Sequence, residues 1–270
     1  MRTLEPLEHP VVDLHAHVLP GLDDGPASLA ESLELLRASR AAGVTRIAAT
    51  PHVRDDHPTE VTAMERAVLD VRAAAEAEGI PVEVLPGGEL SLSRVSRFDD
   101  ETLRRFGLGG NPSLLLVETP YAGWSPVLAD LVFHLALRGF RVVLAHPERN
   151  AAVQAKPSLL EPLVRAGTLV QLTAGSLDGR FGRRAQRCAE TLLAAGAAHL
   201  LASDAHAAAL RGTGFAAAAA AVGQTRLVRW LTLDVPVALL AGAPLPARPQ
   251  RQRARVPRAA APGVPVAVQL

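Results

Sequence analysis

Short apolar runs alternate with longer amphipathic segments along most of the chain. Nearly continuous apolar runs of this kind are typical of parallel strands that are covered on both faces of a sheet. We therefore expect strands at Val11–Leu14, Thr45–Thr50, Val82–Pro86, Leu114–Val117, Arg141–Ala145, Thr168–Thr173 and His199–Ser203.

Helical periodicity fills the segments between these runs. Ser28 and Glu31 stand in the capping-box pattern at the start of a helix, and Gly43 follows its last apolar position. Similar patterns predict helices over residues 59–79, 126–139 and 181–196, whereas residues 90–111 do not fit the alternation. Regular alternation of strand and helix predicts an α/β fold with a parallel sheet, either an open doubly wound sheet or a closed barrel.

Histidines and carboxylates follow almost every predicted strand. Parallel strands present their carboxyl ends on one face, and barrel active sites are built on that face, so these side chains can meet in one pocket. Their placement favours the barrel over the open sheet. The imidazole and carboxylate residues that follow the strands are His15, His17, Asp23, Asp24, His52, Glu89, Glu118, His146, Glu148, Asp204 and His206.

The chemistry of this set points to divalent metal ions. So many titratable groups cannot be buried together unless a cation compensates them. Nitrogen and oxygen ligands without thiolate suit Mn²⁺, Zn²⁺ or Fe²⁺, and the set is large enough for two or three ions. Clustered divalent ions suit hydrolysis. Arg149 and Arg211 flank the ligands, and arginine suits the non-bridging oxygens of a phosphate, so the residues predict a phosphoester substrate.

Composition restricts the remaining possibilities. The chain has 270 residues, of which 49% are hydrophobic, so it can bury a large core. The net charge of +1 gives no general attraction to nucleic acid or to an anionic membrane. The single cysteine, Cys188, excludes an internal disulfide and a multi-cysteine metal site. Neither a transmembrane run nor a signal-peptide pattern is present, so we expect a cytoplasmic protein without membrane insertion.

The composition changes near the end of the chain. Residues 1–241 carry the strand and helix pattern and are expected to form a single domain. Residues 242–270 are rich in proline, alanine and arginine and show no lasting period. A segment of this composition cannot bury enough apolar surface to order itself, so we expect a disordered tail.

The segment DLHAHVLPGLDDG at residues 13–25 resembles the opening motif of the polymerase and histidinol phosphatase (PHP) superfamily. More specifically, it resembles the bacterial tyrosine-protein phosphatases of capsule and exopolysaccharide operons, the CpsB/YwqE group. The resemblance covers roughly residues 11–240. Further motifs follow in the same order: ATPH at 49–52, GGEL at 87–90, VE at 117–118, AHPERN at 145–150, QLTAGS at 171–176 and ASDAH at 202–206.

This resemblance implies a distorted, TIM-barrel-like (β/α)7 barrel and a metal-dependent protein-tyrosine phosphatase with a trinuclear site, often supported by manganese. Arg149 and Arg211 would grip the phosphate while a metal-bridging hydroxide attacks phosphorus in line. Three ion sites are implied: one formed by His15, His17, Glu89 and Asp204, a second by Glu89, Glu118 and His146, and a third by Asp24, His52 and His206.

Two features depart from the family pattern. Arg211 is followed by Gly-Thr-Gly, whereas the family often has Arg-Pro-Pro, so the motif match at Arg211 is incomplete. Tyr121 is the only tyrosine, so the chain carries no tyrosine-rich tail of its own. The resemblance therefore implies a phosphotyrosine protein as a separate partner, by family expectation the tail of a bacterial tyrosine autokinase. The oligomeric state stays open.

Other functions remain as alternatives. A PHP phosphatase for a small phosphomonoester such as histidinol phosphate would share every ligand. A dinuclear amidohydrolase commonly needs a carboxylated lysine at a strand end, but the only lysine, Lys156, lies beyond the fifth strand. A thiol phosphatase needs an arginine six positions after its cysteine, and Ala194 occupies that position after Cys188. A non-catalytic metal-binding module is the last alternative.

Overall fold

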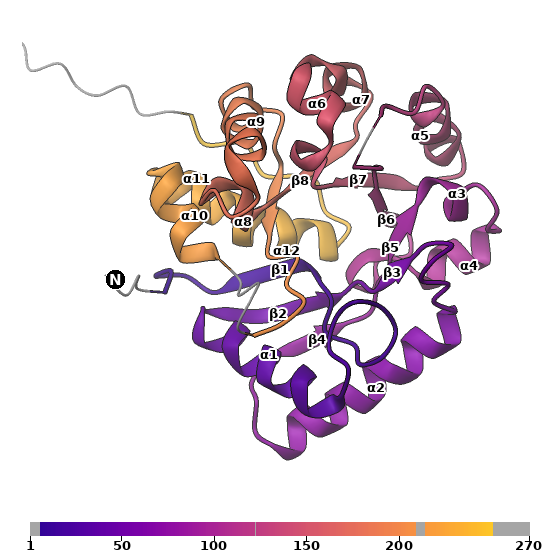
Figure 1. The fold of residues 1–270 in the computed structure, drawn as a ribbon, viewed down its shortest axis with the longest axis vertical. Coiled ribbons are helices and arrows are strands. Elements are labelled where there is room, and N and C mark those ends of the chain that lie inside the picture. The colour runs from indigo at the N-terminus through magenta and orange to yellow at the C-terminus, as the bar shows by residue number, and fades with distance from the viewer. Residues whose placement is uncertain (1–5, 122, 209–213, 251–270) are drawn as a thin grey trace, which may run out of the picture.

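Parallel strands form the centre of the molecule (Figure 1). The computed structural model describes residues 6–121, 123–208 and 214–250. Every strand pairing within these residues is parallel, so the predicted α/β fold with a parallel sheet is confirmed. The strands are β1 (Val11–Ala16), β2 (Val44–Ala49), β3 (His52–Val53), β4 (Glu83–Leu85), β5 (Glu89–Ser91), β6 (Leu114–Glu118), β7 (Arg141–Ala145), β8 (Leu169–Thr173) and β9 (Leu200–Ala202).

The strands of the described residues pair into two sheets, ordered β1-β2-β4 and β3-β5-β6-β7-β8-β9. The closed barrel is not confirmed, because these ladders do not form one closed sheet. A physical reason lies in Pro51 and Pro86, which stand between β2 and β3 and between β4 and β5. Proline has no N–H to donate to a ladder, so each interruption separates a strand from the short strand that follows.

Backbone contacts join the two sheets where β1 and β9 end. The N–H of His17 donates to the carbonyl of Ala205 at 2.8 Å, and the N–H of Asp204 donates to the carbonyl of His15 at 2.8 Å. The buried side chain of Asp13 accepts a further bond from the N–H of Ser203 at 3.0 Å. The first and last strands therefore present their carboxyl ends side by side.

Helices cover the strands on both sides. In Figure 1, α1 and α2 lie below β1, β2 and β4, whereas α5, α6, α7 and α9 lie beyond the larger sheet. The α-helices are α1 (Leu29–Ala41), α2 (Val61–Ala77), α3 (Leu92–Val95), α4 (Asp100–Arg105), α5 (Leu128–Leu137), α6 (Ala151–Ala155), α7 (Glu161–Arg165), α8 (Ala174–Leu177), α9 (Gly182–Ala194), α10 (Phe215–Val222), α11 (Thr225–Arg229) and α12 (Val235–Leu240). The 3-10 helices are η1 (Leu108–Gly110), η2 (Pro147–Arg149) and η3 (Pro157–Leu160), and the π-helical turn η4 spans Trp230–Asp234.

Local sequence accounts for the main helices. The Ser28 hydroxyl accepts a bond from the N–H of Glu31 and so caps α1, as the capping-box pattern predicts. Helix α2 buries one stripe at a helical spacing against the strands. Full burial of an aliphatic side chain stabilises the fold by about 1.5–3 kcal/mol, so this stripe fixes α2 on the sheet. Its members are Val61, Met64, Val68, Val71 and Ala75.

The segment after α12 runs along the surface to residue 250 and makes specific contacts. The indole Nε1 of Trp230 donates to the carbonyl of Pro246 at 2.9 Å. Arg248 donates to the carbonyls of Ala198 and Leu193 at 2.5 and 2.9 Å, and its guanidinium lies over the Trp230 ring. The first part of the expected disordered tail is thus held against the domain by hydrogen bonds. Residues 251–270 lie outside the described residues.

Candidate metal centre

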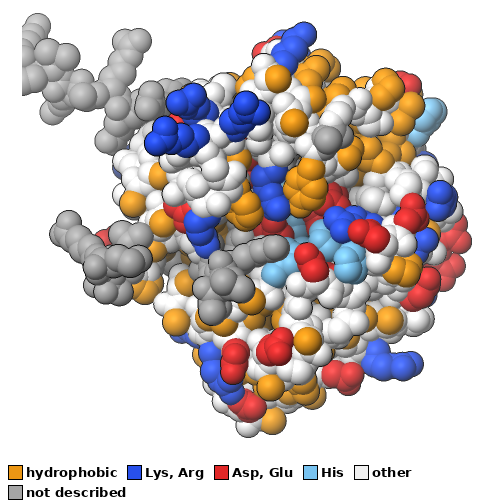
Figure 2. Space-filling model, in the orientation of Figure 1, with side chains coloured by type: hydrophobic (Ala, Val, Ile, Leu, Met, Phe, Trp, Pro, Cys, Tyr) orange, Lys and Arg blue, Asp and Glu red, His pale blue; other side chains and the backbone are white. Residues whose placement is uncertain are grey.

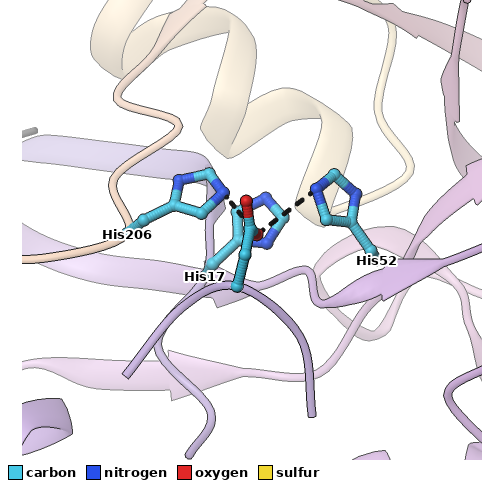
Figure 3. Close-up of side chains that lie close together, drawn as sticks. His17, His52 and His206 are labelled. Carbon is cyan, nitrogen blue, oxygen red and sulfur yellow. Dashed lines mark ion pairs between the residues drawn. The ribbon is translucent and has the colours of Figure 1, made fainter. Parts of the chain in front are cut away.

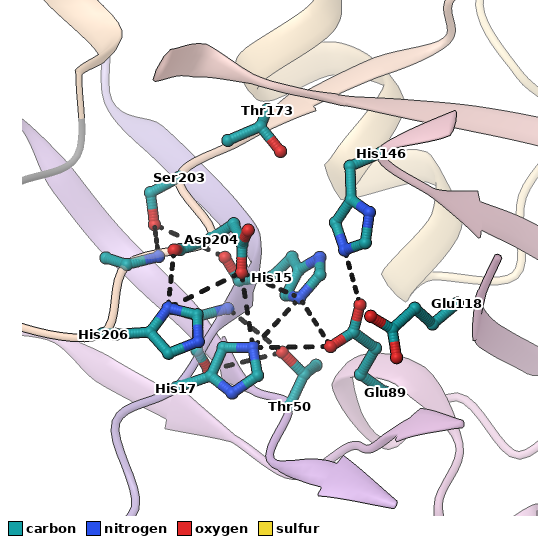
Figure 4. A network of polar contacts seen from close by, with 12 residues as sticks. His15, His17, Thr50, Glu89, Glu118, His146, Thr173, Ser203, Asp204 and His206 are labelled. Carbon is teal, nitrogen blue, oxygen red and sulfur yellow. Dashed lines mark hydrogen bonds and ion pairs between the residues drawn. The ribbon is translucent and has the colours of Figure 1, made fainter. Parts of the chain in front are cut away.

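The nine candidate ligands all lie in one cluster. Figure 4 shows seven of them: His15, His17, Glu89, Glu118, His146, Asp204 and His206. The nine form four overlapping groups in which the ligand atoms lie within 4.8 Å of one another. Except for Asp24, every member is buried. The groups are His17, Asp24, His52 and His206; His15, His17 and Glu89; His15, His146 and Asp204; and His52, Glu89 and Glu118.

The ends of the parallel strands position these side chains. Strand β1 supplies His15, the short strands β3 and β5 begin with His52 and Glu89, and β6 ends with Glu118. His146 and Asp204 follow β7 and β9 with positive φ angles of 33° and 50°, the only positive values among non-glycine residues of the described chain. Such backbone conformations carry strain and persist where the surrounding structure fixes them.

Outer hydrogen bonds fix the orientation of the His15 and His17 rings. The Nδ1 of His15 lies 3.0 Å from the Oε1 of Gln171, an oxygen that also accepts the N–H of His146. The Nδ1 of His17 lies 2.6 Å from a carboxylate oxygen of Asp23. An amide or carboxylate oxygen can only accept, so each Nδ1 carries a proton and each ring turns its Nε2 toward the cluster, where a bound cation would take the Nε2 lone pair.

His206 is held in a comparable way. Its Nδ1 donates to the backbone carbonyl of Asp204 at 2.9 Å, and its Nε2 lies 3.0 Å from Asp24 Oδ1. The Nε2 of His52 approaches the same oxygen to 3.5 Å. Figure 3 shows that the rings of His17, His52 and His206 lie close together although they come from separate segments of the chain, and all three belong to the ligand group of Asp24. The half-exposed carboxylate of Asp24 lies at the solvent-facing end of the cluster.

Glu89 lies at the centre of the cluster and is completely buried. Its Oε1 lies 2.7 Å from His146 Nε2, whereas its Oε2 lies 2.7 Å from His52 Nδ1 and 3.5 Å from His15 Nε2. The two oxygens of one carboxylate therefore face different imidazoles. Such a carboxylate has the arrangement needed to bridge two cations.

Electrostatics favours charged carboxylates at this centre. Burial raises the pKa of Glu89, but the imidazoles of His15 and His146 outweigh it and hold this pKa well below its ordinary value. Burial acts likewise on Asp204, whose pKa is also held well below its ordinary value by His15 and His17. Burial and the neighbouring charge of Glu89 raise the pKa of Glu118 to about 7. The repulsion between Glu89 and Glu118 is relieved when a cation lies between them.

Several polar atoms in the cluster fit a divalent ion better than they fit one another. His15 Nε2 and His17 Nε2 lie 3.3 Å apart and both face the cluster, where a cation would bind the lone pairs of both nitrogens. The buried atoms Glu89 Oε2 and His52 Nδ1 have no hydrogen-bond partner of acceptable geometry. Inward-facing lone pairs without donors are what a cation site requires, so these residues fit the expected metal ions.

Arg149 borders the cluster at the mouth of the site. Its guanidinium donates to the carboxylate of Asp204 through Nη1 and to the hydroxyl of Tyr121 through Nη2. Figure 2 shows histidines reaching the surface in the middle of this face, with basic and acidic side chains around them. The second predicted phosphate-binding residue, Arg211, lies outside the described residues, so its position relative to Arg149 is not given by the structure.

The sequence analysis did not assign the roles of three residues of the surrounding network. Gln171 and Asp23 orient His15 and His17, and Arg54 places Nη1 3.4 Å from both oxygens of Glu118. Gln171 gave one readable signal, because a polar residue inside an apolar buried strand needs a partner. The sequence around Arg54 contained no such signal, since nothing in its position distinguishes it from the other arginines of the chain.

The fold and the site define an α/β protein with a nitrogen- and oxygen-lined metal centre of the hydrolase type. The model of the family described as "Capsular polysaccharide synthesis, CpsB/CapC" matches residues 11–228. The chain therefore belongs to the CpsB/CapC family.

Known relatives agree with this assignment. The chain is 35% identical over 198 residues to the tyrosine-protein phosphatase YwqE of Bacillus subtilis, an alignment that covers 73% of this chain and 77% of YwqE. It is 27% identical over 209 residues to the tyrosine-protein phosphatase CpsB of Streptococcus agalactiae, covering 73% and 83% of the two chains.

Solved structures agree as well. A chain from the crystal structures of YwqE from Bacillus subtilis and CpsB from Streptococcus pneumoniae, described as unique metal-dependent tyrosine phosphatases, superposes with a TM-score of 0.79 and 30% identity. The match covers 89% of this chain and all of that one. A protein from Acinetobacter baumannii described as a probable 2-pyrone-4,6-dicarboxylic acid hydrolase shares the fold alone, at 16% identity and a TM-score of 0.53. The match covers 86% of this chain and 99% of that one.

Proposed function

We propose that the protein is a metal-dependent protein-tyrosine phosphatase that takes part in the control of capsule or exopolysaccharide synthesis. The observation that carries the proposal is the convergence of nine buried or half-buried nitrogen and oxygen ligands beside Arg149. Its family relatives YwqE and CpsB are named tyrosine-protein phosphatases, and this gives the site its substrate class.

Two to three divalent ions would occupy the cluster, with Mn²⁺ as the expected metal and Fe²⁺ or Zn²⁺ as alternatives. The four ligand groups of the structure support this number, because they share His15, His17, His52 and Glu89. Such bound ions supply Lewis acidity that polarises the phosphoryl group and lowers the pKa of water. We propose the same assignment of ligands to three separate ions that the family resemblance implies, in which Glu89 would be shared by two of the ions.

The protein's own residues perform the remaining tasks. Arg149 binds the non-bridging oxygens of the phosphate, since its guanidinium has more N–H donors than its bonds to Asp204 and Tyr121 use. Gln171 and Asp23 hold the imidazoles of His15 and His17 with their lone pairs inward. These fixed orientations prepare the site before the substrate arrives, which is where electrostatic catalysis gains most. Arg211 is proposed as the second phosphate ligand.

The architecture is proposed to be a distorted barrel. Strands β2 and β3 would count as one strand interrupted at Pro51, and β4 and β5 as one interrupted at Pro86. The backbone bonds between the ends of β1 and β9 support closure at the remaining side. We also propose a single domain that extends to residue 250 and acts in the cytoplasm. No helix within the described residues is long and apolar enough to cross a membrane.

The proposed partner is a separate phosphotyrosine protein, such as the tyrosine-containing tail of an autokinase. The half-exposed Asp24 and the rim residue Tyr121 leave the cluster open on one side, as a protein substrate requires.

Metal analysis combined with turnover tests the proposal. We expect the manganese-loaded full chain to hydrolyse a phosphotyrosyl peptide, and chelation of the metal to abolish the activity. Turnover of histidinol phosphate far above that of the peptide would replace the tyrosine-phosphatase function by the small-substrate alternative. Absence of turnover with every phosphomonoester, in protein of full metal content, would indicate a metal-binding module without catalysis.

A further inference from the structure

Tyr121 places an exposed aromatic ring directly at the mouth of the metal cluster. It is the only tyrosine of the chain, and 45% of its surface is exposed. Its ring lies nearly parallel to the His146 ring, with an interplanar angle of 10° and a centroid distance of 6.0 Å. An aromatic side chain at this place borders both a candidate metal ligand and Arg149.

The loop that carries Tyr121 is tied to the segment after β7. The N–H of Ala151 donates to the carbonyl of Tyr121 at 2.9 Å. The side-chain amide of Asn150 donates to the carbonyls of Pro120 and Gly123, the latter at 2.8 Å. Since Asn150 follows Arg149 directly, the ring and the phosphate-binding arginine are fixed by the same short segment.

Arg149 also connects two aromatic rings. Its guanidinium carbon lies 5.0 Å from the centre of the Tyr121 ring and 4.4 Å from the centre of the Phe181 ring. Both distances are within the range of cation–π attraction. Aromatic residues make up only 3% of the chain, so the presence of two rings on one arginine is a distinctive feature of this site. The Phe181 side chain is partly buried, whereas the Tyr121 side chain is exposed to solvent.

We propose that Tyr121 forms a subsite for the aromatic ring of an aryl phosphomonoester, and that Phe181 holds Arg149 in position without contacting the substrate ring. This inference rests on the proposed phosphatase function. A phosphate bound by Arg149 at the cluster carries its aryl group on the bridging oxygen, one bond from phosphorus. Tyr121 is the exposed aromatic side chain among the described contacts of Arg149, and it offers a surface on which that aryl ring stacks.

The subsite gives a physical basis for discrimination between substrates. Aromatic pairs gain about 0.5–1.5 kcal/mol beyond the burial of their area, which corresponds to about two- to twelvefold in affinity. A cyclohexyl group has similar size and apolar area but no π-system, so it gains burial without this addition. The protein is therefore expected to prefer aryl over alkyl phosphomonoesters by about that factor.

Calorimetry with two phosphonates tests the subsite independently of catalysis. Phenylphosphonate and cyclohexylphosphonate are titrated into the manganese-loaded full chain and into the variants Tyr121→Leu, Tyr121→Phe and Phe181→Leu, with metal content measured for each. We expect the wild type and Tyr121→Phe to prefer the phenyl compound by about two- to twelvefold, and Tyr121→Leu to bind both compounds equally. Phe181→Leu is expected to weaken both by the same factor, because it disturbs only Arg149.

The results separate the subsite from the proposed function. An unchanged phenyl preference in Tyr121→Leu, no preference in the wild type, or failure of the wild type to bind either phosphonate would overturn the subsite. A preference lost in Phe181→Leu but kept in Tyr121→Leu would transfer the role to Phe181 and also overturn it. Hydrolysis of a phosphotyrosyl peptide by the wild type is measured in parallel: turnover without a phenyl preference removes the subsite alone, and a phenyl preference without turnover removes the phosphatase function alone.

Discussion

Gln171 Oε1 accepts a hydrogen bond from His15 Nδ1 at 3.0 Å inside a completely buried environment. This single contact decides which nitrogen of His15 carries the proton and therefore which nitrogen can bind a metal. Gln171 comes from the middle of β8, a strand whose end contributes no candidate ligand. The strand nevertheless takes part in the site through this contact.

Replacing Gln171 by leucine is expected to weaken manganese binding by about 10- to 100-fold, because residues that orient metal-binding histidines have effects of this size. Calorimetric titration of metal into the metal-free protein measures the change. Gln171→Glu is the matched control, since its carboxylate still accepts from His15 Nδ1, and it should retain most of the affinity. Equal affinity in wild type and Gln171→Leu would show that His15 needs no such partner.

His146→Ala is expected to lower both the metal content per chain and the rate of phosphotyrosine hydrolysis. The His146 Nε2 atom lies 2.7 Å from Glu89 Oε1. Removal of the imidazole takes away one candidate ligand on the side of the cluster that Glu89 Oε1 faces. Elemental analysis of the purified protein and a peptide assay provide the two measurements. The exposed His134 on α5 gives the control, His134→Ala, which should change neither quantity. Wild-type turnover at full metal content in His146→Ala would refute the role of His146.

Arg149→Ala is expected to weaken inhibition by inorganic phosphate by about 10- to 150-fold, as the loss of a charged hydrogen bond worth about 1.5–3 kcal/mol requires. Competition against a peptide substrate measures the inhibition constant. Arg66→Ala, at an exposed position of α2, is the control for a general loss of positive charge. If phosphate inhibits Arg149→Ala and the wild type equally, phosphate does not bind at Arg149.

The environment of His199 predicts that the folded protein loses stability in mild acid. Its Nδ1 accepts a bond from the N–H of Val170 at 3.1 Å, which requires a neutral ring, and burial followed by the charges of Arg248 and Arg141 lowers its pKa to about 4. Between pH 6.5 and 4 the unfolded chain binds a proton at this residue and the folded chain does not. Stability therefore falls as the pH falls through this window, by at most about 3 kcal/mol.

The variant His199→Gln stays neutral and keeps an acceptor oxygen, so its stability should depend less on pH than that of the wild type between pH 6.5 and 4.5. Urea unfolding at several pH values gives the two slopes. His134→Gln removes an exposed histidine and should leave the slope as it is in the wild type. Parallel curves for wild type and His199→Gln would show that His199 is not responsible.

Arg248→Ala should destabilise the fold by about 1–3 kcal/mol, because the carbonyls of Ala198 and Leu193 lose a charged donor and the Trp230 ring loses its cover. Thermal and urea unfolding measure the loss. Arg248→Lys keeps the charge but has no planar fork, so it should recover only part of the stability. A variant as stable as the wild type would mean that residues 243–250 contribute little to the fold.

The expected strands correspond to β1, β2, β4, β6, β7, β8 and β9, whereas β3 and β5 were not predicted. The expected strand Arg141–Ala145 has the bounds of β7, since a continuous apolar run has one plausible structure between two helices. Strands β3 and β5 have only two and three residues, too few for any periodicity. Their existence follows from pairing with neighbouring strands after Pro51 and Pro86, which is tertiary information that no local pattern contains.

The site shows the same division between local and tertiary information. The candidate ligands were readable because histidine and carboxylate immediately after buried strands are unusual, and the structure brings all nine together. The residues that orient them were less visible. Asp23 differs from Asp24 only by one position, yet Asp23 faces His17 and the N–H of His52 while Asp24 faces His206. Which of two adjacent carboxylates faces the cluster depends on the course of the loop.

The junction of β1 and β9 has a consequence for biosynthesis. Asp13 and Ser203 are 190 positions apart, and the bond between them lies beside the ligands His15 and Asp204. A nascent chain that has not yet emerged past residue 206 lacks two of the side chains around which the cluster closes. Enzymatic competence thus arises only when translation of nearly the whole domain is finished, so incomplete chains released from ribosomes would be unable to remove phosphate from any target.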